Sequence, residues 1–167
     1  RFDPGQRMPG FVRVLRAEQL ALQQRGGVGG RPRKHPAIRL GGGETVLTQA
    51  AVKDFQSSLR GPLLMAGQDG YDRARKVWNG MIDRRPALIA QCSGAADVVR
   101  SVQFARSNDL LVAVRSGGHS TSGQSVCDGG LMIDLSPMHG VRVDPKAKRA
   151  WVPGGSLLGE LDREAQF

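Results

Sequence analysis

Between residues 87 and 115, apolar and polar positions follow a pattern that predicts a strand, a helix and a second strand. The run Ala87–Cys92 is apolar and short, as in a buried strand. Residues 95–107 then place apolar side chains on one stripe at helical spacing. The valine-rich run Leu111–Arg115 predicts a second buried strand. Together they form one βαβ unit, whose strands must be parallel. The expected stripe consists of Val98, Val102 and Ala105.

Shorter elements flank this unit. Thr48 can cap a helix over residues 49–60, which Gly61-Pro62 ends. Residues 71–77 predict a helical turn with Arg75 and its basic neighbours pointing outward. Ser156 can begin a last helix. Short strands are expected at residues 63–65, 131–135, 140–143 and 149–152, the last two as a hairpin.

The first 43 residues differ in composition from the rest of the chain. The net charge of the whole chain is +9, and residues 1–50 hold 9 Lys and Arg against 3 Asp and Glu. Residues 26–43 contain nine prolines and glycines, which is typical of a linker. We therefore expect a disordered basic tail over residues 1–43 and a folded domain over residues 44–167, with the boundary near Glu44.

A basic tail can attract nucleic acid or acidic lipid. An alternative hypothesis is thus a non-catalytic nucleotide- or nucleic-acid-binding module that carries such a tail. The stretch lacks a recognised nucleic-acid-reading motif with interleaved aromatic residues, so a solvated tail is favoured and nucleic acid is not expected as a partner.

The remaining composition favours a soluble cytoplasmic protein. No apolar run approaches the roughly 20 residues that a membrane-spanning helix needs, and no hydrophobic signal region follows Arg1, so no membrane partner is expected. Cys92 lies in an apolar run and Cys127 precedes Asp-Gly-Gly. Two isolated cysteines at such positions are more often reduced packing residues than a disulfide or a metal pair.

A glycine-rich loop follows the second strand of the βαβ unit. Gly117 and Gly118 let the backbone turn and approach a ligand closely, because no Cβ stands in the way. The small polar residues His119, Ser120, Thr121 and Ser122 precede Gly123. Successive amides of such a run make an anion-binding nest that suits phosphate oxygens. A glycine-rich surface turn is an equally open interpretation.

Three better-known loops do not fit this spacing. A dinucleotide fingerprint needs G-x-G-x-x-G at the start of a helix, whereas these glycines fall at 117, 118 and 123 with no helical pattern behind them. A P-loop needs Gly-Lys, and no lysine lies between 77 and 145. A nucleophile elbow needs G-x-S-x-G, but Gly123 comes one place late after Ser120. The interpretation that is left is a diphosphate-binding loop that follows none of these three patterns.

Two further side chains near the loop have open roles. Arg115 can pair with a diphosphate or offset charge on a reduced cofactor, or it can be a strand-end arginine in solvent. His119 follows a strand's carboxyl end, where ligands bind in α/β sheets, but a loop histidine bonded to backbone is the commoner case. His35 and His139 have no second ligand at metal spacing, so we expect surface residues and no metal site.

Several blocks of sequence from about Leu63 to Phe167 resemble one family. They are Val77-Trp78-Asn79-Gly80-Met81-Ile82-Asp83-Arg84-Arg85-Pro86, Val114-Arg115-Ser116-Gly117-Gly118-His119-Ser120 with Gly123, Cys127-Asp128-Gly129-Gly130-Leu131-Met132-Ile133-Asp134-Leu135-Ser136, and Gly154-Gly155. In this order they are similar to the berberine-bridge-enzyme-like FAD-linked oxidases.

The resemblance implies an α+β fold, namely the N-terminal subdomain of a PCMH-type (vanillyl-alcohol-oxidase-type) FAD-binding domain. It implies FAD as the cofactor, held by residues 115–123: Arg115, Ser116, Gly117, Gly118, His119, Ser120, Thr121, Ser122 and Gly123. His119 matches the histidine that the family bonds to the 8α-methyl carbon of the flavin. The implied activity is oxidation of an alcohol, sugar or amine with O2 as acceptor. Trp78 and Asn79 are expected to pack.

The family often attaches its flavin through a second cysteine as well, but the region that holds this cysteine is not matched here, and Cys127 belongs to a different motif. The chain reaches Phe167 inside an expected helix without a polar stop. We therefore expect a truncated FAD-binding domain that is inactive as an oxidase on its own. No catalytic base is identified.

Overall fold

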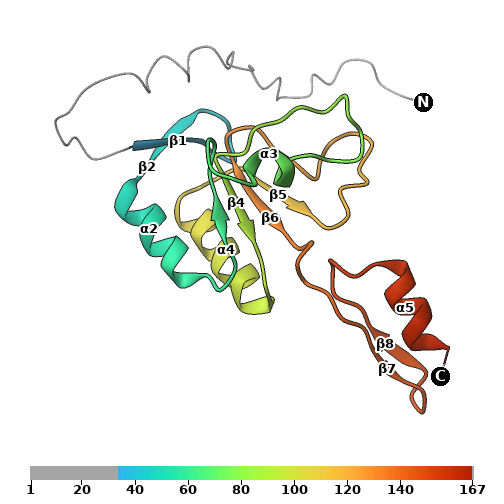
Figure 1. Ribbon diagram of the computed structural model, residues 1–167. Coiled ribbons are helices and arrows are strands. Elements are labelled where there is room, and N and C mark those ends of the chain that lie inside the picture. Colours follow the sequence, from blue (N-terminus) through green and yellow to red (C-terminus); the bar gives the residue numbers. More distant parts are fainter. Residues whose placement is uncertain (1–33, 167) are drawn as a thin grey trace, which may run out of the picture. The chain divides into compact units, whose positions relative to one another are not determined.

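The computed structural model describes residues 34–166, and its centre is a four-stranded sheet. The strands β3 (Leu63–Leu64), β4 (Leu88–Gln91), β6 (Leu131–Asp134) and β5 (Val112–Arg115) lie side by side in this order (Figure 1). β4 and β5 both run parallel to β6, and β3 is antiparallel to β4. The predicted βαβ unit therefore exists, but β6 from later in the chain lies between its two strands.

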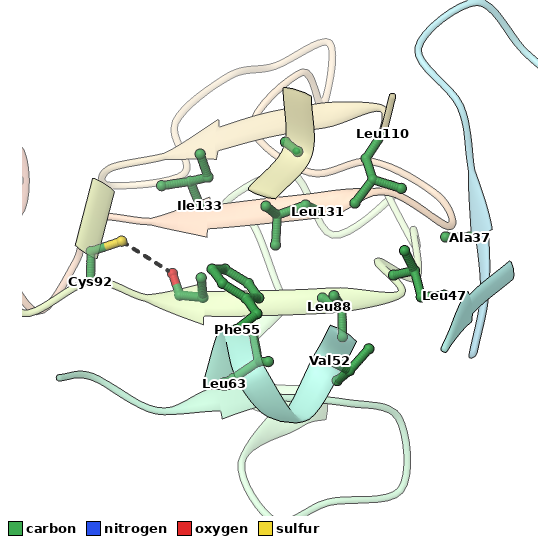
Figure 2. Packing of buried hydrophobic residues seen from close by; sticks show 12 residues of the cluster. Ala37, Leu47, Val52, Phe55, Leu63, Leu88, Cys92, Leu110, Leu131 and Ile133 are labelled. Carbon is green, nitrogen blue, oxygen red and sulfur yellow. Dashed lines mark hydrogen bonds between the residues drawn. The ribbon is translucent and has the colours of Figure 1, made fainter. Parts of the chain in front are cut away.

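The sheet is covered on both faces because side chains alternate along its strands. On one face, Leu88, Leu131 and Ile133 pack against α2 (Gln49–Ser58) and α4 (Ala95–Ser107), as Figure 2 shows for part of this cluster. Phe55 of α2 stacks on Phe104 of α4 with ring centroids 4.1 Å apart. The mixture of helices and strands confirms the expected α+β class.

On the opposite face, Ile89 and Met132 are fully buried against Tyr71, Ala74 and Val126. Tyr71 and Ala74 belong to α3 (Tyr71–Ala74), and Val126 follows the glycine-rich loop. This second cluster joins the two segments that form the candidate site.

The folded part begins earlier than the expected boundary at Glu44. Strand β1 (Lys34–Ile38) pairs antiparallel with β2 (Glu44–Thr48), and Ala37 of β1 is buried in the main core. The backbone of Ile38 also accepts a hydrogen bond from Leu111 N and donates one to Gly129 O. Interpreting residues 34–43 as linker was therefore wrong, because their glycines form the turn of a hairpin. Residues 1–33 and their expected disorder lie outside the described residues.

Helix α4 has the predicted bounds, and Val98 and Ala105 of the expected stripe pack in or against the core. Its buried residues are Asp97, Ser101 and Ala105, whereas Val102 is exposed. Both carboxylate oxygens of Asp97 accept hydrogen bonds from the backbone amides of Arg60, Gly61 and Ser93. These hydrogen bonds, rather than apolar packing, explain why Asp97 is buried.

Strand β5 is an edge strand, contrary to the expectation of a buried one. Val112 and Val114 are exposed, and only Ala113 of this strand is buried. The strand has β6 on one side and no strand on the other within residues 34–166.

Strands β7 (Arg142–Asp144) and β8 (Arg149–Trp151) form the expected antiparallel hairpin, which is followed by α5 (Leu158–Ala165). Leu157, rather than Ser156, is the residue at the start of α5, and its amide donates to Glu160 Oε2 at 2.8 Å. Among the described residues no helix has the length and apolar character needed to cross a membrane.

Candidate functional site

The glycine-rich loop leaves the end of β5 and turns at two glycines with positive φ. Gly118 has φ +71° and Gly123 has φ +72°, which favour glycine over other residues. A methyl group at Gly123 would lie 2.7 Å from Cγ2 of Ile82, so the backbone approaches this side chain closely. Both glycines are thus required by the local structure.

Between these turns the loop offers a run of hydrogen-bond donors. The amides of Gly117 to Ser122 donate no hydrogen bond to another residue of the described range, whereas Gly123 N donates to Ser120 O. The hydroxyl of Ser125 is buried and has no hydrogen-bond partner in this part of the chain. Six consecutive free amides with nearby hydroxyls match the donor set that a diphosphate requires, so the residues present fit the expected cofactor.

A second segment, residues 75–85, holds the loop in place. Trp78 N donates to Gly118 O at 3.0 Å, and Asn79 Nδ2 donates to Thr121 O at 2.8 Å. Arg84 Nη1 donates to Gly123 O at 2.7 Å and to Val126 O at 2.9 Å. The loop is therefore held at Gly118 and Thr121, within the run of unpaired amides, and at Gly123 and Val126, just after it.

Residues 75–85 are themselves fixed by Arg75, which does not point outward as expected. Its guanidinium donates to carboxylate oxygens of Asp72 and Asp83 and to Arg84 O. Hydrogen bonds with Asp83 and Asp72 raise the pKa of Arg75, and the same bond to Arg75 lowers the pKa of Asp83. This ion-pair network closes the segment into a compact turn.

The imidazole of His119 is exposed and lies over Gly117. A methyl group on Gly117 would come within 2.6 Å of Cδ2 and Nε2 of His119, so the ring in its present position depends on glycine at 117. The ring centroid of Trp78 is 5.9 Å from that of His119, with 48° between the planes. The structure thus brings together His119 and Trp78, which are 41 positions apart in the sequence.

Trp78 is not packed as expected, because 77% of its surface remains exposed. Asn79 does act structurally: its Oδ1 accepts from Met81 N at 3.1 Å while its Nδ2 donates to Thr121 O. The side chain of Met81 is also exposed. The segment therefore presents two apolar side chains beside the glycine-rich loop.

Arg115 points away from the loop amides and into the protein. Its Nε and Nη2 each donate to a carboxylate oxygen of Asp134 at 3.1 Å, and Nη2 also donates to Ser136 Oγ. Its Nη1 donates to the carbonyls of Ala74 and Lys76. All five N–H donors of the guanidinium have protein acceptors. This arrangement matches neither expected role, because Arg115 is neither free for a diphosphate nor solvated.

The hydroxyls of the loop are divided between local bonds and exposed positions. Ser116 Oγ donates to Gly154 O, which ties the start of the loop to the Gly154-Gly155 motif. Ser120 Oγ lies 3.2 Å from Ser122 Oγ and accepts from Gln124 N. The side chain of Thr121 is exposed.

The cysteines are free and buried, which agrees with the expected packing role. Burial raises the pKa of Cys127 to about 11, so this thiol is protonated at neutral pH and is a poor nucleophile. His35 lies in β1 and His139 contacts Glu160, and residues 34–166 contain no group of His, Cys, Asp and Glu that could hold a metal ion.

Three comparisons identify what this chain resembles. Residues 86–166 match a family model described as an FAD binding domain. The crystal structure of 6-hydroxy-D-nicotine oxidase from Arthrobacter nicotinovorans is 39% identical with a TM-score of 0.61, covering 65% of this chain and 24% of that one. Berberine bridge enzyme-like 9 of Arabidopsis thaliana is 25% identical, covering 68% of this chain and 22% of that protein. Over these matched parts the chain is similar to berberine-bridge-enzyme-like proteins and FAD-linked oxidoreductases.

The crystal structure of a carbohydrate oxidase from Microdochium nivale is 32% identical with a TM-score of 0.59, covering 66% of this chain and 24% of that one. The chain thus spans about a quarter of the length of the FAD-linked oxidoreductases that it matches. The matched part is N-terminal and has the PCMH-type fold, which confirms the fold expected from the sequence.

Proposed function

We propose that the chain binds FAD through the loop from Ser116 to Gly123 and serves as the flavin-attaching part of an oxidase. Six consecutive amides, from Gly117 to Ser122, donate to no other residue among residues 34–166, and they carry this proposal. The diphosphate of FAD supplies negatively charged acceptor oxygens, and backbone amides that converge on one concavity suit such a group. The hydroxyls of Ser120, Thr121 and Ser122 add donors at the same loop. Arg115 supports the loop from behind rather than contacting the diphosphate.

His119 is the proposed attachment residue. Its ring is exposed and stands on the loop, so a ring nitrogen is accessible to the 8α-carbon of a flavin. In the net reaction an imidazole N–H and one C–H of the 8α-methyl group are replaced by a C–N bond. The two hydrogens and their two electrons pass to O2, which becomes H2O2. The imidazole must be neutral when its nitrogen forms this bond.

When bound, FAD supplies the capacity to accept a hydride from an alcohol, sugar or amine and to pass the electrons to O2. The residues of this chain hold and orient the cofactor for that task. We expect no turnover from residues 1–167 alone, because the chain spans about a quarter of its relatives' length. Catalysis needs positioned partners on the substrate side of the flavin and a site that excludes water.

The test compares two exposed histidines in the full-length gene product that contains this chain. After denaturing electrophoresis, the flavin fluorescence of the protein band should be retained in His139→Ala and lost in His119→Ala. Mass spectrometry should place the flavin on the peptide that contains His119. An unmodified His119 peptide from a protein that retains FAD after denaturation would contradict the attachment, and failure of the native protein to bind FAD would contradict the function.

A further inference from the structure

Trp78 occupies an unusual position for a tryptophan. Its side chain is 77% exposed, although burying an indole removes a large apolar area from water. Its backbone is nevertheless fixed, since Trp78 N donates to Gly118 O at 3.0 Å and the next side chain, that of Asn79, donates to Thr121 O at 2.8 Å. These two bonds lie on either side of His119. The backbone that carries the indole is thus fixed beside the loop, with the indole centroid 5.9 Å from the imidazole centroid.

We propose that Trp78 is a positioning residue for the flavin ring, an inference that rests on the proposed binding of FAD. Its indole would contact the dimethylbenzene end of the isoalloxazine and keep the 8α-methyl carbon at His119. The 5.9 Å between the Trp78 and His119 centroids is in the range of aromatic pairs, so a ring bonded to His119 reaches the indole. The exposed Met81 adds apolar surface on the same segment.

A flat aromatic ring is the occupant that best fits this surface. In the proposed function, the loop amides that have no partner among residues 34–166 bind the diphosphate of FAD, and His119 binds one carbon of its ring. Trp78 is the aromatic side chain in contact with that histidine. The proposal therefore assigns the diphosphate to the loop and the ring to Trp78.

Reversible binding separates these two contributions. In the His119→Ala background, where FAD cannot be attached there, affinities for FAD and for ADP are measured by calorimetry. ADP carries the diphosphate but lacks the isoalloxazine. Trp78→Ala should weaken FAD binding about tenfold, which corresponds to about 1.4 kcal/mol, and leave ADP binding unchanged. Trp78→Phe should retain most of the affinity for FAD.

Trp151 supplies the matched control, because it is also exposed, lies on β8 and contacts Arg142 instead of the loop. Trp151→Ala should change neither affinity. Asn79→Asp replaces the amide that donates to Thr121 O by an acceptor, so it should release the segment and weaken FAD binding as well.

A second readout uses the variants with His119 intact. Trp78→Ala should lower the fraction of protein that carries covalent flavin, whereas Trp151→Ala should not. Equal FAD affinity in Trp78→Ala and Trp151→Ala would overturn the role of Trp78 and leave the proposed function standing. An equal loss of FAD and ADP affinity would show that Trp78 only supports the loop. Absence of FAD binding before any change at Trp78 would instead contradict the proposed function.

Discussion

Arg115 and Asp134 form a buried ion pair that connects the sheet to the candidate site, and its removal should strongly destabilise the chain. Asp134 is fully buried and accepts from Arg115, from Gln91 Nε2 and from Ser136 N. Arg115→Met would leave this carboxylate without its cation and the Ala74 carbonyl without its donor. Breaking a buried pair by removing one partner costs about 3–5 kcal/mol.

The assay is urea unfolding of the chain, followed by far-ultraviolet circular dichroism. With a slope of about 2 kcal/mol per molar urea, the midpoint should fall by about 2 M in Arg115→Met. Arg115→Lys should recover little of this loss, because an ammonium cannot make the two-pronged contact with Asp134 while also reaching the carbonyls of Ala74 and Lys76.

A double-mutant cycle isolates the pair from its surroundings. Arg115→Met combined with Asp134→Leu should be less destabilised than the sum of the single variants, by about 2 kcal/mol or more, since no charge is then left buried. The reasoning is refuted if each single variant moves the midpoint by less than about 0.3 M, a shift below 1 kcal/mol, or if the two changes are additive.

Three further outcomes are expected. Gly117→Ala should displace the ring of His119 and lower the fraction of covalent flavin, measured by fluorescence after denaturing electrophoresis; an unchanged fraction would show that the ring has another place to lie. Burial alone would raise the pKa of Asp97, but its bonds from backbone amides outweigh this and lower it. Its contribution to stability is therefore complete above the ordinary pKa of about 4 and is lost as the pH falls toward the lowered folded value. Asp97→Asn should lower the free energy of unfolding at pH 7 by about 2–3 kcal/mol, because the charged acceptor of three backbone amides is lost. In urea melts at lower pH, the loss of stability that protonation of Asp97 causes should be absent from this variant. Deleting residues 1–32 should leave the thermal midpoint within a few degrees, whereas deleting residues 1–43 should lower it strongly because strand β1 is lost with it; equal midpoints would show that β1 is dispensable.

Local patterns predicted most of the elements. The bounds of α4 follow from helical spacing between two loop signals, and the cap at Thr48 is present, with its Oγ1 accepting from Ala51 N at 3.2 Å. The β7–β8 hairpin follows from two short strands around Asp144-Pro145. Such features depend on residues within a few positions of each other, so a single sequence is enough to find them.

The burial of Asp97 in α4 was not predictable in this way. Counting apolar residues favours Val102, yet Asp97 is buried because amides of Arg60, Gly61 and Ser93 surround its carboxylate. Two of these donors lie more than 35 positions away, and no periodicity within the helix indicates them. A buried polar residue is specified by partners in the fold rather than by its own neighbours.

The candidate site likewise combines features that depend on neighbouring residues with features that depend on residues far away in the sequence. The loop with its glycines and His119 was predicted from the sequence, because a loop after a strand is a local signal, and its role in binding FAD stays a prediction. The segment that braces the loop was not found, since the bonds from Trp78 and Asn79 cross about 40 positions. The role of Arg115 was missed for the same reason, because its acceptors are Asp134 and carbonyls near α3.

The strand order also bears on how the site comes into being during protein synthesis. β4 and β5 leave the ribosome before β6, yet neither pairs with the other, and β6 occupies the place between them. The glycine-rich loop joins β5 to β6, so both of its ends are fixed only when β6 inserts. At about 5–20 residues per second, residues 120–134 follow His119 within about one to three seconds. During this interval the loop around His119 is fixed at one end only, and we expect the nascent chain to be unable to bind FAD. We therefore expect the proposed binding of FAD to begin only after Asp134 has been translated.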